Sequence, residues 1–476
     1  MSIVVFYGPI MTIPFDSQLE QISHADLIAM VRALLVRVDS LEKENQKLRE
    51  EIERLKRPKA NSQNSSQPPS RDQKPNAPSG KQKRKHGPPF GHKRSVRKLV
   101  DNPDRVIRVD VNQCESCQHD LSATEPSKVV RRQITELPEV KPIVLETQQA
   151  EKVCPHCQHL NRSTLPVGLE ADRYFGPRLE ASIVFLKHQN HFSYERIVQA
   201  LRELFGLEIS EGGVATIIAR AGKLAADCAA EIRQAVISSS IIQSDETSSR
   251  VKGRNYWHWV FLSQSGAYHQ IVPRRNAKVI RDLMGKAMTD VWVSDCSSAQ
   301  MTAPAKNFQL CIQHQLRDLK RILDRAPGLA WTSQVGELFR EAIHLNNRMI
   351  SPSPDLTLNG FHRRVAEIGN RLDRLPECPL IDPDEMRLQK RFQIHRQKLL
   401  TFLDYPGVPP TNNASEQAIR TSVINRKVTN GFRSEWGAKA YADLLSVIST
   451  SKIKGQGVLT TLVNLMGPEV LTFLHA

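Results

Sequence analysis

A strict heptad pattern lies near the start of the chain. Leucine recurs at every seventh position from residue 27 to residue 55, and a second core position, mostly β-branched, precedes the last four of these leucines by three residues. Leucine at one core position, with β-branched residues and one Asn at the other, is typical of a parallel two-stranded coiled coil. The pattern predicts a homodimeric zipper over residues 25–57, after a tail at 1–24, and one amphipathic helix packed on its own domain is the alternative. The core positions are Leu27, Leu34, Leu41, Leu48 and Leu55, with Val31, Val38, Asn45 and Ile52.

Apolar positions then almost disappear. Residues 58–100 are rich in Asn, Ser, Gln, Pro and Lys, so they cannot bury a core and are expected to form a disordered linker. The segment is basic, which suits contacts with DNA phosphates that carry no sequence information. A linker that is merely well solvated is the alternative. The candidate phosphate contacts are Lys81, Lys83, Arg84 and Lys85.

Two Cys-x-x-Cys pairs mark residues 101–168. Each pair offers two thiolates, and four thiolates complete the tetrahedral shell of a structural zinc ion. Strand-like pieces near residues 129, 134 and 144 lie between the pairs, which predicts a zinc-ribbon-like module with a β-hairpin between its knuckles. Redox pairs or buried metal-free thiols are the alternatives. The four zinc ligands would be Cys114, Cys117, Cys154 and Cys157.

Helical periodicity returns over residues 169–236. A helix over 179–188 is followed by a second, which Ser193 caps and Gly206 ends, and by a third that starts at Ser210 and runs to about residue 221. Two helices joined by a short turn fit a helix-turn-helix DNA-binding domain. Its second helix, over residues 214–220, would enter a major groove. A bundle that binds nothing is the alternative.

Short apolar runs of the strand type follow. The chain is expected to form an antiparallel meander of three strands, then a helix, a fourth strand and another helix. Helical spacing then continues from 327 to 405. The order β-β-β-α-β-α predicts a ribonuclease H-like core over 237–326 and 406–476, with an all-helical insertion between them. The fold class is therefore multi-domain α+β. The expected strands are 239–247, 256–263, 268–272 and 291–295, and the expected helices of the first part are 276–288 and 308–326.

Acidic residues end two of these apolar runs. Asp245 closes the first, where we expect the strand to leave the core, Asp295 closes the fourth, and Glu416 starts the helix after the insertion. Mg²⁺ prefers carboxylate oxygens, and two such ions about 3.5–4 Å apart can activate water and stabilise the leaving oxygen of a phosphodiester. The three residues are candidate ligands of a two-magnesium site, in which Asp245 bridges both ions. Glu246 should point to the opposite face of the strand.

Each acid also has a simpler interpretation. Asp295 could be a turn residue at a strand end, and Glu416 could be the partner of Asn413 in a capping box. These alternatives stay open as long as the acids are considered one at a time. Their combination with the strand order is what favours the metal site.

The formal net charge of +16 favours a polyanionic partner, either nucleic acid or a membrane surface. No apolar run approaches the roughly 18–20 residues of a membrane span. The first ten residues lack the basic start and the cleavage site of a signal peptide, and Met11 is an alternative start to Met1. Paired thiols without a signal fit a reducing compartment. We therefore expect double-stranded DNA as the partner, no membrane association, and a cytoplasmic location.

Several motifs together resemble the DDE transposases of the insertion-sequence-sixty-six type. The resemblance covers most of the chain from the zipper onward, and it implies a ribonuclease H-like fold with a helical insertion. It also implies Asp245, Asp295 and Glu416 as metal ligands, transposon-end DNA as substrate, and a bacterial protein at the nucleoid. The motifs are the segments 64–70, 194–196, 244–247, 255–257, 294–295, 311–317, 412–420 and 431–438, with the Cys-x-x-Cys pairs.

In such transposases a Cys-x-x-His element lies near the start of the insertion. Here it corresponds to Cys311 and His314, which share one helix face. We expect them to pack and orient groups beside the active site, with Arg317 of the same motif, and a metal role is the alternative. Basic residues after Glu416 are expected to hold DNA phosphates, with a solvated basic face as the alternative. These residues are Arg420, Arg426 and Arg433.

The sequence thus predicts a transposase that binds the inverted-repeat ends of an insertion sequence. Water would cut a strand and free a 3′-hydroxyl, which would then attack target DNA. A homodimer through residues 27–55 is expected, and accessory proteins of the same element are candidate partners. A non-catalytic zinc and zipper regulator derived from a transposase is the main alternative, and a zinc and coiled-coil scaffold is another.

Overall fold

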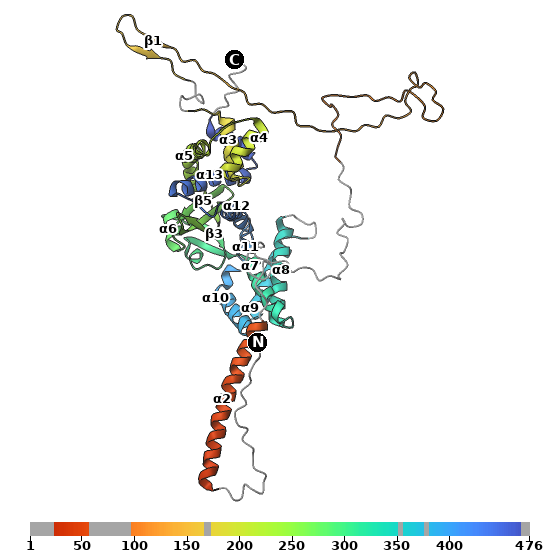
Figure 1. Cartoon of the computed structure of the whole chain (residues 1–476). Coiled ribbons are helices and arrows are strands. Elements are labelled where there is room, and N and C mark those ends of the chain that lie inside the picture. The colour runs from red at the N-terminus through yellow and green to blue at the C-terminus, as the bar shows by residue number, and fades with distance from the viewer. Residues whose placement is uncertain (1–22, 57–96, 166–172, 351–355, 376–379, 468–476) are drawn as a thin grey trace.

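The computed structural model describes residues 23–56, 97–165, 173–350, 356–375 and 380–467. The expected N-terminal tail, most of the basic linker and the side chains of residues 49–56 lie outside the described residues, as do Lys81, Lys83, Arg84 and Lys85. The described chain is a mixed α+β protein with 13 α-helices and two sheets (Figure 1). None of the helices in these ranges combines the length and the apolar character that a membrane crossing requires.

A five-stranded mixed sheet lies at the centre of the fold (Figure 1). Its strand order is β5-β4-β3-β6-β7. The first three strands along the chain form an antiparallel meander, β6 runs parallel to β3, and β7 runs parallel to β6. The strands are β3 (Ile241–Val251), β4 (Arg254–Ser263), β5 (Gly266–Val272), β6 (Thr289–Ser294) and β7 (Ala305–Leu310).

Local sequence explains both kinds of pairing. β3 and β4 are joined by Lys252 and Gly253, whose φ angles of 49° and 74° are those of a two-residue hairpin turn. In β6, Val291, Trp292 and Val293 are all buried, which is the continuous apolar run that a central parallel strand needs. The turn therefore fixes the meander, and the apolar run fixes β6 in the middle of the sheet.

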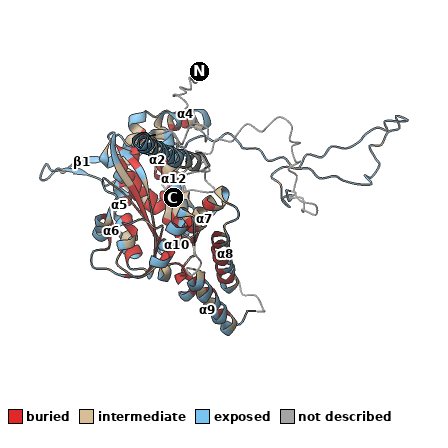
Figure 2. Ribbon diagram, turned by 90° about the horizontal axis from the view of Figure 1, so that it is seen from below, coloured by how far each residue is buried: buried red, intermediate tan, exposed pale blue. Residues whose placement is uncertain are grey.

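Helices cover both faces of this sheet. On one face, Trp259 and Trp292 pack with Ile280 of α6 (Ala277–Met284). On the other face, α12 (Asn413–Thr429) packs on β3 and β4, and α13 (Glu435–Ile453) packs on β5. The buried strands are enclosed between these helices (Figure 2).

The helical segment before β3 shares a hydrophobic cluster with the C-terminal helices. Ser193 caps α4 by accepting from the Arg196 amide at 3.2 Å, and Gly206 ends it with φ 63°, so both predicted boundaries are confirmed. Glu180 of α3 is fully buried and forms ion pairs with Arg173, at 2.6 Å, and with Arg220 of α5. The helices are α3 (Pro177–His188), α4 (Tyr194–Phe205), α5 (Glu211–Ile237), α13 and α14 (Val458–Met466).

The closest approach of α5 and α13 is at Gly222. A Cβ added there would lie 2.4 Å from the Cβ of Ala440, so the two helices pack backbone against backbone. We expect Gly222→Ala to lower the free energy of unfolding by about 1–3 kcal/mol, because the helices must separate to admit the methyl group. Chemical denaturation of the purified protein would measure this.

Gly212→Ala is the matched control, since its Cβ would meet only the Ser210 Oγ at 3.7 Å in the same helix. Without a clash, alanine in place of glycine should stabilise the helix by up to about 1 kcal/mol. Equal effects of the two substitutions would contradict the close helix contact.

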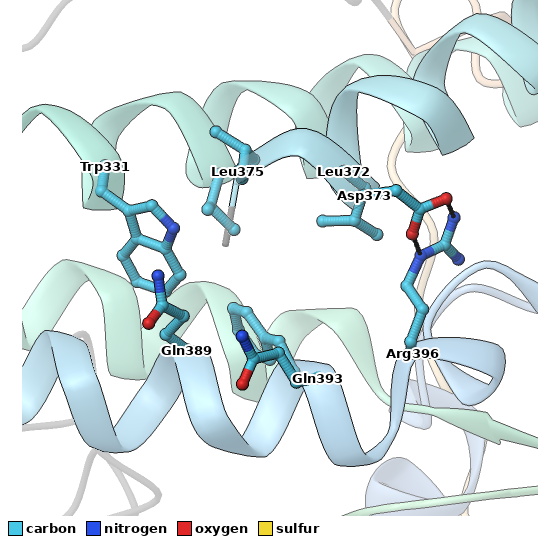
Figure 3. Close-up of a pocket in the computed structure, with 9 residues that line it drawn as sticks. Trp331, Leu372, Asp373, Leu375, Gln389, Gln393 and Arg396 are labelled. Atoms are coloured by element: carbon cyan, nitrogen blue, oxygen red, sulfur yellow. Dashed lines mark hydrogen bonds and ion pairs between the residues drawn. The ribbon is translucent and has the colours of Figure 1, made fainter. Parts of the chain in front are cut away.

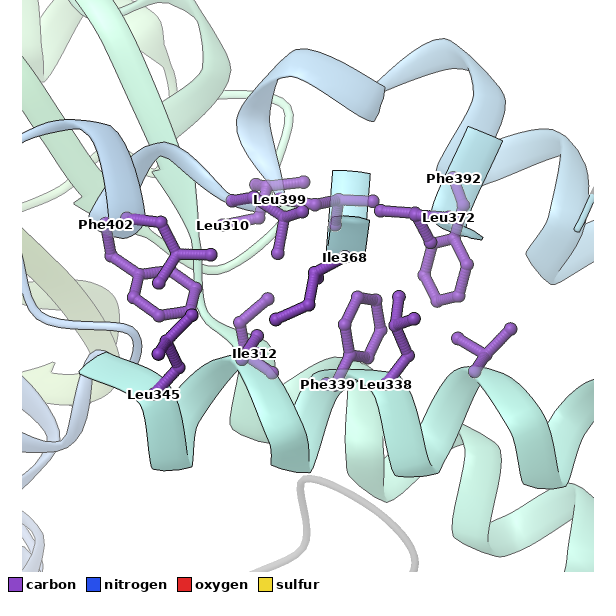
Figure 4. Close-up of a cluster of buried hydrophobic side chains, with 14 of the residues drawn as sticks. Leu310, Ile312, Leu338, Phe339, Leu345, Ile368, Leu372, Phe392, Leu399 and Phe402 are labelled. Carbon is purple, nitrogen blue, oxygen red and sulfur yellow. The ribbon is translucent and has the colours of Figure 1, made fainter. Parts of the chain in front are cut away.

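The predicted insertion is helical throughout its described residues. Its helices pack around a hydrophobic cluster that also includes Leu310 and Ile312, at the end of β7 and the start of α7 (Figure 4). A cavity of about 210 Å³ opens near Trp331 and the Asp373–Arg396 ion pair, and none of the three candidate acids lines it (Figure 3). The helices of the insertion are α8 (Ala330–Ile350), α9 (Leu358–Arg374), α10 (Pro383–Ile394) and α11 (Thr401–Asp404), and α7 (Ile312–Arg325) precedes them in the first part of the core.

The N-terminal segments have little tertiary packing. The predicted zipper is one helix, α2 (His24–Lys56), and its leucine seam is exposed, with Leu34 at 52% and Leu48 at 55%. A single chain that leaves this seam open is compatible with pairing to a second chain, so the zipper stays a prediction. The short strands β1 (Glu151–Val153) and β2 (Leu160–Arg162) form a hairpin around the second Cys pair.

Four expectations about secondary structure were wrong. Residues 305–310 form β7 rather than the start of a helix, because pairing with β6 outweighs their weak strand propensity. Asp245 lies inside β3, which continues with β4 as far as Val251. The helix expected to end near residue 221 continues to Ile237, since Gly222 is a contact point with α13. The strand-like pieces at 129–145 form no strand and are mostly exposed.

Candidate active site

Asp245 and Asp295 lie where two neighbouring strands separate. β3 pairs with β6 only from Ile241 to Gln243, and beyond this point β3 continues with β4 alone. Asp295 directly follows β6, which ends at Ser294. Parallel strands that part in this way leave space between their ends for polar groups. Both acids are thus placed at the same edge by the sheet itself.

The neighbouring acids at this edge all affect the pKa of the Asp245 carboxyl. Burial raises its pKa well above the usual range, and the charges of Glu246, Asp295 and Glu416 raise it further. Its Oδ1 accepts a hydrogen bond from the Glu246 amide at 2.9 Å, which partly opposes this rise. The other two candidate acids, which come from the end of β6 and from α12, therefore both influence the Asp245 carboxyl on β3.

Asn412 fixes the start of the helix that carries Glu416. This residue is fully buried, and its Nδ2 donates to the Ser244 carbonyl at 2.8 Å, beside Asp245. Its backbone amide donates to the Cys311 Sγ at 3.2 Å. One residue thus ties α12 to β3 through its side chain and to the start of α7 through its backbone. No chemical signal in the sequence singled Asn412 out from its polar neighbours.

Glu416 lies in the first turn of α12 and faces α7. Its Oε1 lies 3.6 Å from the His314 Nδ1, and its Oε2 lies 3.6 Å from an Arg317 Nη2. Asn412, whose side chain makes no capping hydrogen bond, is the N-cap of α12. The geometry does not match a capping box between Asn413 and Glu416. The carboxylate is instead turned toward the Cys-x-x-His element.

Glu246 interacts more closely with the surroundings of Asp295 than its predicted orientation suggested. Its side chain is 1% exposed and accepts from the Arg275 Nε at 3.0 Å and from the Gln300 Nε2 at 2.7 Å. Gln300 is fully buried and also binds Ser244 and the Trp292 indole. Burial and the charge of Asp295 raise the pKa of Glu246. Sequence reasoning missed both partners of Glu246, namely Arg275 and Gln300, and Gln300 holds the segment after β6 in place.

A polar cavity of about 440 Å³ opens beside Asp295. Its lining includes Arg275, Asp295, His314 and Arg391. The Asp295 Oδ1 accepts from the Ser297 amide at 3.0 Å, so the turn after β6 is held by its own acid. The two arginines and the carboxylates of Asp295 and Asp318 surround one opening. Such a surface can bind both a phosphate and a cation.

The two Cys-x-x-Cys pairs have the same local geometry. In each, the first cysteine amide binds the carbonyl five residues later, from Cys114 to His119 and from Cys154 to His159, at 2.9 Å. Backbone amides of the next residues lower the pKa of the Cys114 and Cys154 thiols, which favours thiolates. The two knuckles therefore share one turn conformation, in which backbone amides lie near the first cysteine.

One metal-binding group stands out in the part of the chain that the structure describes. Cys311, His314 and Glu416 offer ligand atoms that all lie within 4.8 Å of one another. The four knuckle cysteines are not gathered around one point in this way, and neither are the carboxylate oxygens of Asp245, Asp295 and Glu416.

The basic residues after Glu416 differ in their surroundings. Arg420 and Arg433 are exposed, whereas an Nη atom of Arg426 donates to the Ser248 carbonyl and hydroxyl. Arg220, in the helix expected to enter a major groove, is paired with buried Glu180. Arg420 in α12 and Arg433 after it are thus better placed for phosphate than Arg220 in α5.

Comparison with known proteins agrees with this geometry. Residues 172–440, more than half of the chain, match the model of the family described as "Transposase IS66 family". No curated protein matches the chain. The matched segment includes the whole central sheet, the insertion and all three candidate acids. The chain belongs to the IS66 family of transposases.

Proposed function

We propose that this protein is a metal-dependent DNA transposase that binds the inverted-repeat ends of its element and cuts and joins strands with Asp245, Asp295 and Glu416. The observation that carries the proposal is the placement of the acids: Asp245 lies where β3 parts from β6, Asp295 directly follows β6, and Glu416 lies in the first turn of α12, which packs on β3. The charges of Asp295 and Glu416 both raise the pKa of Asp245, which supports this placement. Membership of a transposase family supports DNA strand cleavage and transfer as the reaction, and the three acids are the proposed site of that reaction.

The catalytic core is proposed to be ribonuclease H-like. The strand order β5-β4-β3-β6-β7, with an antiparallel meander followed by two parallel strands, supports this. The acids stand on β3, after β6 and on α12. The helical insertion lies between β7 and α12, so it lengthens the chain without entering the sheet.

Magnesium fits the proposed donor set. The three ligands offer only carboxylate oxygens, which hard divalent ions prefer. Burial and mutual repulsion make the charged form of Asp245 unfavourable, and a cation would offset both. Asp245 would bridge two ions, and Asp295 and Glu416 would each complete one. When bound, such ions activate the attacking oxygen and stabilise the leaving oxygen of the phosphodiester.

Neighbouring residues are proposed to position these acids. Asn412 holds the Glu416 helix against β3, and Gln300 and Glu246 hold the segment that follows Asp295. Arg275 and Arg391 line the cavity next to Asp295, where they can attract a DNA phosphate. None of these five residues needs to exchange a proton with the substrate.

Segments outside the core are proposed to deliver DNA. Two α2 helices would dimerise through the seam at 27–55. The two knuckles, once brought together around one zinc ion, would form the predicted ribbon. The helices from 173 to 237 would contact the element ends, and the proposed phosphate contacts are Lys81, Lys83, Arg84, Lys85, Arg420, Arg426 and Arg433. Accessory proteins of the element are further proposed partners.

A donor plasmid carrying the element ends would test this function. With purified full-length protein and Mg²⁺, we expect strand cleavage at the ends and joining to a second DNA. Omission of Mg²⁺ should abolish both steps while DNA binding, followed by gel shift, remains. End-specific binding without cleavage in Mg²⁺ or Mn²⁺ would contradict the proposal and favour a regulator instead.

A further inference from the structure

The junction between the insertion and α12 brings three different metal-binding groups together. Cys311 is the N-cap of α7, His314 lies in its first turn, and Glu416 lies in the first turn of α12. The thiol, imidazole and carboxylate ligand atoms all lie within 4.8 Å of one another. Two helix starts that are far apart in the sequence thus meet with their functional groups facing one point.

The facing atoms of His314 and Glu416 are unsatisfied. The His314 Nδ1 and the Glu416 Oε1 are both buried, and neither has a hydrogen-bond partner among the described residues. They lie 3.6 Å apart, too far for a hydrogen bond between them. A buried polar atom without a partner costs about 1–3 kcal/mol, so two that face each other point to a missing third group.

The Cys311 thiol is the third candidate ligand beside His314 and Glu416. Its side chain is fully buried, and its Sγ accepts from the Asn412 amide at 3.2 Å. Burial raises the pKa of the thiol, while the amides of Asn412, His314 and Gln313 partly oppose the rise. Amide donors around a sulfur orient it and stabilise its thiolate form when a cation replaces the proton.

We propose that Cys311, His314 and Glu416 form a binding site for Zn²⁺, which is distinct from the cysteine knuckles and has only Glu416 in common with the magnesium site. Thiolate, imidazole and carboxylate are zinc ligands, whereas Mg²⁺ avoids sulfur and nitrogen. Three protein ligands leave a fourth tetrahedral position for water. His314 also lines the polar cavity beside Asp295, which gives the ion a path from solvent.

Glu416 would be shared between this site and the proposed active centre. A zinc ion bound to Cys311 and His314 holds the Glu416 carboxylate on the α7 side, away from Asp245 and Asp295. Zinc should therefore inhibit magnesium-dependent cleavage. This inhibition rests on the proposed function, whereas zinc binding itself does not.

Metal binding by the full-length protein tests the site directly. After removal of bound metal, zinc affinity and stoichiometry are measured by competition with a chromophoric chelator, and Co²⁺ serves as an absorbing probe of thiolate ligation. We expect Cys311→Ser and His314→Ala each to bind one zinc ion per chain fewer than wild type, or to bind it at least about 100-fold more weakly. Cys228→Ser, in α5, is the matched control and should bind zinc as wild type does.

The outcomes separate the site from the function. If both variants keep their fold by circular dichroism and bind as many zinc ions as wild type with equal affinity, the site is wrong, and Cys311 and His314 only position Glu416. If Cys311→Ser unfolds, the partly exposed His314 variant decides alone. If the variants lose zinc binding and neither they nor the wild type cleaves DNA, the zinc site is supported and the proposed function is contradicted. Zinc that binds without inhibiting would remove only the regulatory consequence.

Discussion

Asp245→Asn is expected to reduce DNA cleavage and joining by at least about a thousandfold, which corresponds to about 4 kcal/mol of transition-state stabilisation. The amide has nearly the shape of the carboxylate but cannot bridge two divalent ions. Strand transfer from a supercoiled donor in Mg²⁺ would measure the loss. DNA binding should be retained, because the proposed DNA contacts come from basic residues and the N-terminal segments rather than from Asp245, which is only half-exposed within β3.

The same substitution should not destabilise the fold. Burial and three neighbouring acids raise the folded-state pKa of Asp245, so its ionised form costs folding free energy. An acid with a raised folded pKa destabilises the native state progressively as pH rises from the unfolded value toward the folded one. Asparagine removes this cost. In the absence of metal, the melting temperature of the variant at neutral pH should therefore equal or exceed that of wild type.

Asp290→Asn is the matched control for this experiment. Asp290 lies in β6, is about half exposed and pairs with Lys306 at 2.8 Å, so the same chemical change is made near the site but outside it. We expect its activity to stay within about twofold of wild type, since exposed ion pairs contribute little. Comparable activity of the Asp245 variant and wild type would show that this residue is not a metal ligand.

Glu180→Ala should lower the free energy of unfolding by about 3–5 kcal/mol, the usual cost of removing one partner of a buried ion pair. Glu180 is 1% exposed and contacts Arg173, which is 7% exposed, and Arg220. Arg173 also donates to the Met466 carbonyl at 2.8 Å, so the acid links α3, α5 and the end of α14. Without this carboxylate, the buried Arg173 and the half-buried Arg220 lose their shared counter-charge in that junction.

Urea denaturation would compare this variant with Glu203→Ala in α4. Glu203 is 65% exposed and lies beside Arg202, and its loss should change stability by no more than about 0.5 kcal/mol. Similar small effects at both positions would mean that the Glu180 ion pairs do not hold the helices together. A reduced m-value for Glu180→Ala would indicate that part of the cluster unfolds separately.

The sequence carried most of the information about the sheet and its acids. Apolar runs located β3 and β6, and the acids at 245 and 295 stood out because carboxylates rarely follow buried strands without a reason. Ser193 and Gly206 fixed the ends of α4 through local capping chemistry. These features depend on neighbours in the sequence, and such features can be predicted without a structure.

Features that depend on distant contacts were missed. β7 is a strand because β6 pairs with it, and Gly222 continues a helix because Ala440 lies against it. Gln300 and Asn412 are ordinary polar residues until the fold buries them beside Glu246 and Ser244. Hydrophobic periodicity and secondary-structure propensity depend on the local sequence and carry no information about such contacts. The residues that position the acids could therefore not be found in advance.

The hydrogen bonds at the base of the insertion have a consequence for how this fold can change. The Ile312 amide binds the Pro410 carbonyl at 2.9 Å, and the Asn412 amide binds Cys311, so the entrance and the exit of the insertion are held side by side. The free energy of closing a loop grows only slowly with its length. Insertions of very different length could therefore replace one another between α7 and α12 during evolution without moving Glu416. Each replacement would have to cover the apolar side chains of Val293 and Leu310 in the sheet.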